Sequence, residues 1–181
     1  MRIAAVETRR YVFPFEPPLR VAWDPVPRTS QEATIVIVRS DDGVEGYASG
    51  DALPDRELIE RLLVGVDPLR TEVVHELCET VDFHHARPWA AEAAVWDLVG
   101  RALDTPCWQL LGGRSDRLVA YASNAELLSA EERVARVVAL RDAGIRAVKI
   151  RFHHADWREG VATIEAVRDA VGPGLEIMVD A

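Results

Sequence analysis

Three charged residues near the end of the chain occupy positions where parallel α/β proteins carry catalytic groups. Lys149 and Arg151 lie two positions apart in an apolar segment, and Asp180 lies at the end of the next apolar segment of this kind. Residues two apart on a strand point to the same face, so the two cations are expected to share one face. Reactive groups of parallel sheets and barrels gather at the carboxyl ends of strands. Two cations beside a carboxylate suit a site that binds an anion and a metal ion together.

A structural interpretation of the same residues stays open. Lys149 and Asp180 would then form a buried ion pair, or the cations would cap the end of a sheet. An unpaired cation inside a closed barrel is costly, so a partner is expected under either interpretation. Taken alone, each of these residues is more often structural than catalytic.

The elements that position these residues alternate between strands and helices. Strands are expected at 118–123, 146–152 and 175–179, with a helix from Ser129 to Gly144 and another from Asp156 to about Gly172. Ser129 with Glu132 three residues later has the pattern of an N-terminal capping box. This β-α-β-α-β alternation predicts parallel strands joined by right-handed crossovers.

Further polar residues lie at the ends of these strands. Ser123 and Asn124 end the first strand, and His153 and His154 directly follow the second. We assign all four as candidate substrate-binding residues because strand ends of this kind line the active sites of parallel α/β folds. For the two histidines, a solvated loop before the next helix is the alternative.

The first half of the chain has the pattern of an antiparallel three-strand meander followed by helices. The expected strands are 3–13, 33–39 and 44–50, and the expected helices are 54–66, 69–81 and 89–103. Pro14, Pro17 and Pro18 predict that the first strand gives way to a loop that runs to about Ser30. That loop carries Trp23, for which packing in a core or an interface is the alternative to contact with a substrate.

The third of these helices is expected to be a core helix. Apolar residues surround it almost completely, which is typical of a helix buried on most sides. Asp97 and Arg101 are an exception and form an i,i+4 pair. The expected contact face consists of Trp89, Ala93, Trp96, Gly100 and Leu103, and it is extended by Ala94, Val95, Val99 and Ala102.

The composition excludes several classes of protein. The chain has 181 residues, of which 49% are hydrophobic, and a formal net charge of -9, which favours a packed core and disfavours a general nucleic-acid binder. Cys78 and Cys107 form no CxxC pair, so neither a disulfide framework nor a cysteine-rich zinc site is indicated. Neither a signal peptide nor a membrane span is recognisable. We therefore expect a cytoplasmic protein.

Several segments together resemble the enolase superfamily, in its mandelate racemase and muconate lactonizing enzyme branch. Residues 1–50 resemble the capping domain, and 91–102 resemble the branch's A-x-x-A-x-W-D-x-x-G-K-A signature, which 110–113 continue as L-L-G-G. Residues 144–151 resemble the G-F-x-x-x-K-x-K strand and 179–181 the V-D-A-N strand. The resemblance covers the whole chain, and the order of its motifs is more specific than any one of them.

The resemblance implies a fold in two parts. An α+β capping domain, with an antiparallel three-strand meander plus helices, is expected at 1–115. The first β/α units of a TIM-type (β/α) barrel are expected at 116–181. Because no helix follows the last strand, we expect this barrel to be incomplete and the chain alone to be inactive. A homo-oligomer, dimer or octamer, is also implied.

The resemblance also implies the chemistry. A small carboxylate substrate would be bound to Mg²⁺, and its α-proton would be removed to give an enediolate whose charge the metal and the cations stabilise. Asp180 matches the first of three carboxylate ligands, and Lys149 would polarise the substrate carboxylate. Trp23 and Asp51 match loops of the capping domain that close over the substrate and set its specificity.

Arg151 departs from the family pattern. The second Lys of K-x-K is the general base on one face of the substrate, whereas arginine stays protonated at ordinary pH. The resemblance places a second base, a His with an Asp behind it, further along the barrel. A one-base reaction follows, so we favour a lyase that dehydrates a sugar acid. A racemase, epimerase or cycloisomerase on the same scaffold, and a non-catalytic enolase-like or α/β binding protein, are the alternatives.

Overall fold

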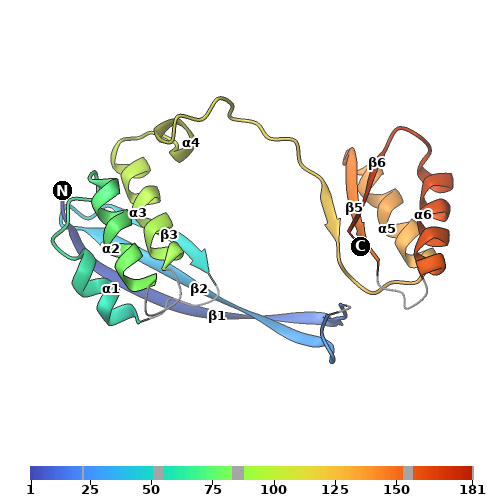
Figure 1. Ribbon diagram of the computed structural model, residues 1–181, viewed down its shortest axis with the longest axis horizontal. Helices are drawn as coiled ribbons and strands as arrows, with labels where there is room; N and C mark the ends of the chain where they lie inside the picture. The colour runs from blue at the N-terminus through green and yellow to red at the C-terminus, as the bar shows by residue number, and fades with distance from the viewer. Residues whose placement is uncertain (22, 51–54, 83–87, 153–156, 181) are drawn as a thin grey trace. The chain divides into compact units, whose positions relative to one another are not determined.

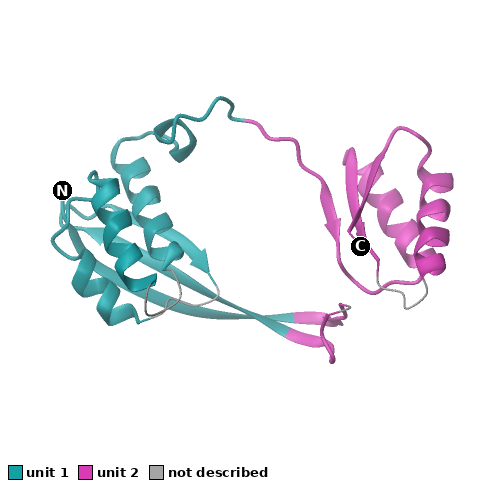
Figure 2. Ribbon diagram, in the orientation of Figure 1, with its two compact units in different colours: residues 1–14, 30–116 teal, residues 15–29, 117–181 magenta. Residues whose placement is uncertain are grey.

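The computed structural model describes the whole chain except residues 22, 51–54, 83–87, 153–156 and 181. The chain divides into two compact units, coloured separately in Figure 2. Unit 1 contains residues 1–14 and 30–116, and unit 2 contains residues 15–29 and 117–181. A segment from near the N-terminus, 15–29, therefore belongs with the C-terminal part of the chain.

Unit 1 is built on a three-stranded sheet. The sheet has the order β1 (Ile3–Leu19), β2 (Arg28–Ser40) and β3 (Glu45–Gly50), and β2 pairs antiparallel with β3. The predicted meander is confirmed. Val36 and Val38 of β2 are fully buried, as expected of β-branched residues on the core side of a pleated strand.

The predicted long loop after Phe13 is wrong. β1 continues through Pro14, Pro17 and Pro18 to Leu19, and β2 already begins at Arg28. β1 lies at the edge of the sheet, so one of its sides has no partner strand and a proline on that side removes no ladder hydrogen bond. Prolines therefore end a central strand more reliably than an edge strand, and only a short connection remains around Trp23.

Four helices follow β3 in unit 1. They are α1 (Arg56–Leu63), α2 (Thr71–Asp82), α3 (Trp89–Ala102) and the short α4 (Cys107–Leu110), which the sequence did not predict. Figure 1 shows α1, α2 and α3 on one face of the sheet. Gly46 allows β3 to approach α3 directly, since a Cβ there would lie 2.1 Å from the backbone oxygen of Ala94. Apolar side chains from the sheet and these helices form one core.

α3 is the core helix that was predicted, and its predicted face is buried in part. Trp89 is 52% exposed and Leu103 is 48% exposed. Ala94, which was expected to extend that face, is fully buried together with Ala91 and Leu98. Small side chains at these positions let the helix backbone approach the sheet closely.

Unit 2 contains a parallel β-α-β-α-β arrangement, as predicted. Its elements are β4 (Ala122–Asn124), α5 (Ala130–Asp142), β5 (Ala147–Arg151), α6 (Trp157–Val171) and β6 (Glu176–Asp180). The strands pair in parallel in the order β4-β5-β6. The capping box at Ser129 is confirmed, because Glu132 accepts a hydrogen bond from the backbone N–H of Ser129 and donates its own N–H to the serine hydroxyl. The predicted helix start at Asp156 lies outside the described residues.

The first strand of unit 2 is shorter than predicted. The stretch from Leu118 to Tyr121 is not part of β4, and Leu118 and Val119 are 93% and 99% exposed. In the rest of the unit, α5 and α6 pack against one face of the sheet, where Val137, Val148 and Val167 are fully buried. The other face of this sheet carries the charged residues described below.

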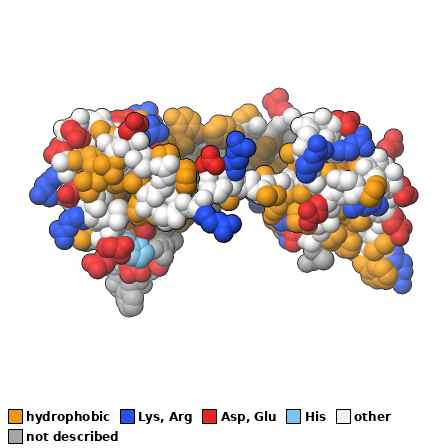
Figure 3. All heavy atoms as spheres, turned by 90° about the horizontal axis from the view of Figure 1, so that it is seen from above, with side chains coloured by type: hydrophobic (Ala, Val, Ile, Leu, Met, Phe, Trp, Pro, Cys, Tyr) orange, Lys and Arg blue, Asp and Glu red, His pale blue; other side chains and the backbone are white. Residues whose placement is uncertain are grey.

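Among the helices that the structure describes, none combines the length and apolarity needed to cross a bilayer. Figure 3 shows basic and acidic side chains interspersed on the visible face, with apolar side chains between them.

Candidate functional site

The candidate site lies at the carboxyl ends of β5 and β6. The parallel register places Arg151 opposite Asp180 and Lys149 opposite Met178. The backbone N–H of Phe152 donates to the carbonyl oxygen of Asp180 at 2.9 Å, so the two strand ends stay paired to the last described residue. Alternation along β5 places Lys149 and Arg151 on the face opposite the buried Val148 and Ile150.

Asp180 joins the two cations. Its Oδ2 lies 3.2 Å from the Lys149 Nζ and 3.6 Å from an Arg151 Nη. The hydrogen bond from Lys149 lowers the pKa of the Asp180 carboxyl most; desolvation opposes this effect, and the charges of Arg151 and Lys149 lower the pKa further. The side chain of Asp180 is 31% exposed, so the carboxylate stays accessible to a ligand. The three residues that the sequence indicated are therefore in direct contact.

The strand before them contributes residues to both faces of the sheet. Ser123 pairs with Lys149 in the register, lies on the same face and is exposed. Asn124 pairs with Ile150 and lies on the helix side, where it is 3% exposed and donates to the carbonyl oxygen of Ala122 at 3.1 Å. The structure thus brings Ser123 to the charged face and does not bring Asn124 there.

Trp23 lies against Arg151. The guanidinium carbon is 4.6 Å from the centroid of the Trp23 ring, which is within the range of a cation–π contact. The segment that carries Trp23 is attached to unit 2 by an antiparallel bridge between Val21 and Glu126 and by a hydrogen bond from the N–H of Leu127 to the carbonyl oxygen of Arg20. Trp23 therefore reaches the strand face by way of the β4–α5 connection.

Three sequence candidates, namely Asp51, His153 and His154, lie outside the described residues. Their assignment to the substrate stays a prediction.

Sequence reasoning missed two residues near the site. Tyr121 precedes Ser123 by two positions, and Lys149 Nζ lies 6.0 Å from the centroid of its ring. The period of two along a strand was the signal that could have identified it. Arg133, on α5, is 1% exposed, and its guanidinium donates to the backbone oxygen of Glu126. An arginine in the first turns of a helix is ordinarily solvated, so the sequence carried no signal for its burial.

The donor chemistry fits one ligand of a hard cation. Mg²⁺ prefers oxygen ligands and is held in many sites by one or two carboxylates together with waters and substrate oxygens. Asp180 offers an ionised carboxylate, which is the protonation state that metal binding requires. Within the described ranges, no group of three or more histidine, cysteine, aspartate or glutamate side chains could hold a metal ion. Asp180 therefore fits as a single contribution to such a site.

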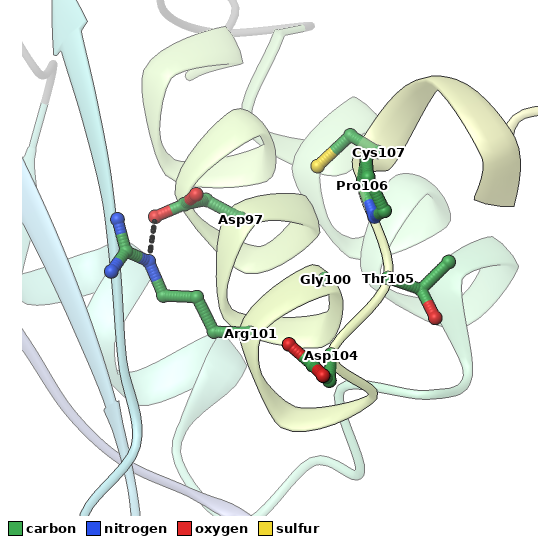
Figure 4. Close-up of a pocket in the computed structure, with 7 residues that line it drawn as sticks. All are labelled: Asp97, Gly100, Arg101, Asp104, Thr105, Pro106 and Cys107. Atoms are coloured by element: carbon green, nitrogen blue, oxygen red, sulfur yellow. Dashed lines mark hydrogen bonds and ion pairs between the residues drawn. The ribbon is translucent and has the colours of Figure 1, made fainter.

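A hollow of about 390 Å³ lies in unit 1 beside the carboxyl end of α3. Figure 4 shows its lining, in which the Nε of Arg101 donates to Asp97 at 2.7 Å. Gly100 is needed there, since a Cβ would lie 2.9 Å from the backbone oxygen of Thr105. Asp97 also accepts the backbone N–H of Tyr47 at 2.8 Å, which ties α3 to β3. This part of the signature segment holds the fold together.

Comparisons with protein families match both parts of the chain. Residues 4–112 match the model of the mandelate racemase / muconate lactonizing enzyme N-terminal domain. Residues 132–181 match the enolase C-terminal domain-like model. The fold is accordingly an α+β capping domain followed by the first β/α units of a TIM-type barrel.

Named relatives catalyse different reactions. A hydrophobic dipeptide epimerase of Enterococcus faecalis is 26% identical over 171 residues, covering 84% of this chain and 46% of the relative. An L-talarate/galactarate dehydratase of Salmonella typhimurium is 26% identical over 173 residues, covering 86% of this chain and 43% of the relative. Other relatives are named as racemases and cycloisomerases. The chain spans about half the length of the curated relatives that it matches first.

Solved structures agree on the fold. A racemase from Streptomyces coelicolor with bound magnesium superimposes with a TM-score of 0.85 at 23% identity, covering 99% of this chain and 55% of the racemase. The family model that matches residues 4–112 covers more than half of the sequence, and the parallel strands that follow match the barrel domain of the same proteins. The chain belongs to the mandelate racemase and muconate lactonizing enzyme family of the enolase superfamily.

Proposed function

We propose that this chain supplies the cap and the first barrel strands of a Mg²⁺-dependent enzyme that removes the α-proton of a small carboxylate substrate, and that its reaction is the dehydration of a sugar acid. The observation that carries the proposal is the contact of Asp180 with both Lys149 and Arg151 at the ends of two parallel strands. Strand ends are where barrel enzymes place their reacting groups.

Each residue has a distinct role in this proposal. Asp180 would hold Mg²⁺ through a carboxylate oxygen. The bound ion would neutralise negative charge on the substrate carboxylate as the α-proton leaves. Lys149, on the same strand face, would donate to a substrate carboxylate oxygen and stabilise the same charge.

Arg151 decides between one-base and two-base chemistry. Its guanidinium stays protonated at ordinary pH, so it binds an anion and does not accept a proton. A planar guanidinium fork matches a carboxylate in bidentate fashion, which orients the substrate. If Arg151 is not a base, a base on the other face of the substrate takes the proton from Cα, and the hydroxide that leaves Cβ takes up a proton and departs as water. The dehydratase among the relatives supports this choice.

Epimerisation is the second candidate, favoured by the named dipeptide epimerase and racemase among the relatives. It requires that the proton be removed from one face of Cα and returned to the other. In the one-base proposal only one configuration at Cα exchanges its proton with solvent.

The test is a screen of the whole protein against sugar acids, N-acylated amino acids and dipeptides, with and without Mg²⁺. We expect loss of water from a sugar acid in the presence of Mg²⁺, no turnover after chelation, and recovery when Mg²⁺ is restored. Deuterium uptake in D₂O should occur from one configuration at Cα. Exchange from both configurations of one substrate would establish the epimerase instead, and metal-independent turnover would contradict the proposed role of Asp180.

A further inference from the structure

The contact between Trp23 and Arg151 is not explained by burial of an apolar residue. Trp23 is 49% exposed and the side chain of Arg151 is 41% exposed, so neither lies in a core. The hydrophobic gain from a half-exposed tryptophan is modest, and many other positions on the surface would provide it. The position of the ring 4.6 Å from the guanidinium carbon therefore has to be explained by something other than burial.

The backbone that carries Trp23 is fixed only two residues away. Val21 is 3% exposed and forms its bridge with Glu126, while the N–H of Leu127 donates to the carbonyl oxygen of Arg20 at 2.8 Å. Two connections of this kind restrict both the position and the direction of the segment. The ring of Trp23 is therefore placed by backbone pairing and does not depend on its own burial.

The β4–α5 connection is itself held in place by a buried residue of α5. Arg133 is 1% exposed and donates a hydrogen bond from its guanidinium to the backbone oxygen of Glu126. An ionised group is costly to bury without partners. The hydrogen bond to the Glu126 backbone offsets part of this cost and holds that backbone in one place. A continuous series of contacts thus runs from Arg133 through Glu126 and Val21 to Trp23 and ends at Arg151.

The contact with the Trp23 ring restricts the orientation of the Arg151 guanidinium. A cation–π contact uses the flat face of the guanidinium and leaves its N–H donors in the plane. Asp180 approaches one Nη at 3.6 Å, beyond ordinary hydrogen-bond distance. With the guanidinium carbon over the ring, a face-to-face arrangement would fix the plane of the fork and keep its donors available for bidentate binding of a carboxylate.

We propose that Trp23 is a positioning residue that orients the guanidinium of Arg151, and that it acts on the substrate through Arg151 and not by direct contact. The role of Arg151 as a carboxylate clamp rests on the proposed function. The orientation of Arg151 by Trp23 does not. Two measurements on the whole protein separate these two parts.

The first measurement is a double-mutant cycle on kcat/KM for the carboxylate substrate. Trp23→Leu should lower kcat/KM by about 3- to 30-fold, the range of a cation–π contact, with Trp23→Phe recovering part of the loss. In the Arg151→Met background, Trp23→Leu should have almost no further effect, because the group that it orients is gone. An equal loss in both backgrounds would show that Trp23 contacts the substrate itself and would overturn the proposal.

The chain offers a matched control. Trp157 is 59% exposed, and its ring lies 4.7 Å from the guanidinium carbon of its neighbour Arg158. Trp157→Leu removes a tryptophan–arginine contact of similar distance that does not involve Arg151, so kcat/KM should stay within about 2-fold of the wild type. A loss as large as that of Trp23→Leu would show that any surface tryptophan has this effect, and would count against a specific role.

The second measurement needs no turnover. In the protein with ¹⁵N-labelled arginine, the Hε signal of Arg151 should be shifted upfield by the ring current of Trp23, and Trp23→Leu should remove that shift. If no shift is present, the positioning proposal fails, whatever the activity. If the shift is present and no carboxylate is turned over, the orientation of Arg151 stands and the proposed function fails.

Discussion

Each unit contains, among its described residues, a cluster of an aspartate, an arginine and an aromatic ring. In unit 1 the carboxylate of Asp97 accepts the Arg101 Nε at 2.7 Å and the backbone N–H of Tyr47 at 2.8 Å. The guanidinium of Arg101 lies 5.2 Å from the centroid of the Tyr47 ring. Each of these contacts joins α3 to itself or to β3, so the cluster connects the elements of one core.

In unit 2 the same three residue types are arranged differently. Asp180 lies between Arg151 and a second cation, Lys149, and the ring over Arg151 belongs to Trp23, far away in the sequence. The carboxylate of Asp180 is thus held by side-chain cations, whereas that of Asp97 also holds the backbone of a strand. The cluster lies at the carboxyl ends of strands and has one more cation than its carboxylate balances.

The difference shows that residue types alone do not identify a reactive site. In unit 1 the carboxylate is occupied by a helix arginine and by the backbone of a sheet, so its replacement affects folding. In unit 2 the surplus positive charge at strand ends would suit an anionic substrate, so replacement of Asp180 should affect chemistry. Substitution of each aspartate in the same way tests this contrast.

The largest expected effect is that of Asp180→Ala on activity. Loss of the proposed metal ligand should lower Mg²⁺-dependent turnover of the whole protein by ~10³-fold or more, because the negative charge that develops on the substrate would lose the ion that stabilises it. The fold should remain, because Asp180 is the last residue of β6 and its ladder bonds come from the backbone. Steady-state kinetics with a Mg²⁺ titration, together with thermal unfolding, give both results. Undiminished activity would exclude Asp180 as a ligand.

Asp97→Ala should give the opposite result. It removes an acceptor from the N–H of Tyr47 and from Arg101, which should lower the free energy of unfolding by about 1–3 kcal/mol. Chemical denaturation at equilibrium measures the change. Under conditions where the variant is fully folded, kcat should stay near the wild-type value. A large loss of kcat without a loss of stability would show that the two clusters are not different in kind.

The sequence predicted most of the fold because the fold follows local rules. Period-two apolar alternation, the turn at residues 40–43 and the Ser129 capping box each specify an element from neighbouring residues alone. The predictions failed where the conformation of a segment depends on its place in the tertiary structure. Whether Pro14 and Pro17 interrupt a strand depends on whether that strand is at an edge, and the edge position of β1 is a property of the whole sheet.

The face of α3 was predicted only in part, for a related reason. Periodicity showed that nearly every side of the helix is apolar, and it could not show which side meets the sheet. Close approach at Gly46 selects the side with Ala94 and Leu98, whereas Trp89 of the predicted face stays about half exposed. The small residue on β3, and not the hydrophobicity of α3, determines which side of the helix is buried.

The candidate site was predicted in part. Lys149, Arg151 and Asp180 could be grouped because strand ends converge in parallel sheets. Ser123 and Asn124 are neighbours on one strand and point to opposite faces, and the register with β5 decides that Ser123 takes the charged face. The contact of Trp23 with Arg151 joins segments 128 positions apart, and only the fold brings them together.

The smallest expected effect concerns a carboxylate with a purely local role, and it completes the series. Hydrogen bonds from the backbone N–H and the hydroxyl of Ser129 lower the pKa of Glu132. Because the pKa is lower in the folded state, the ionised carboxylate stabilises the protein above its unfolded pKa of about 4.3, and this stabilisation is lost as the pH falls through the folded value.

Glu132→Gln keeps the hydrogen-bonding pattern of the capping box and removes the charge. Thermal unfolding of both proteins between neutral and acidic pH should show a small wild-type advantage that disappears in acid. Glu131→Gln, in the same helical turn but outside the box, should change the unfolding midpoint by less, and a wild-type advantage that is constant with pH would show that the charge of Glu132 has no such role.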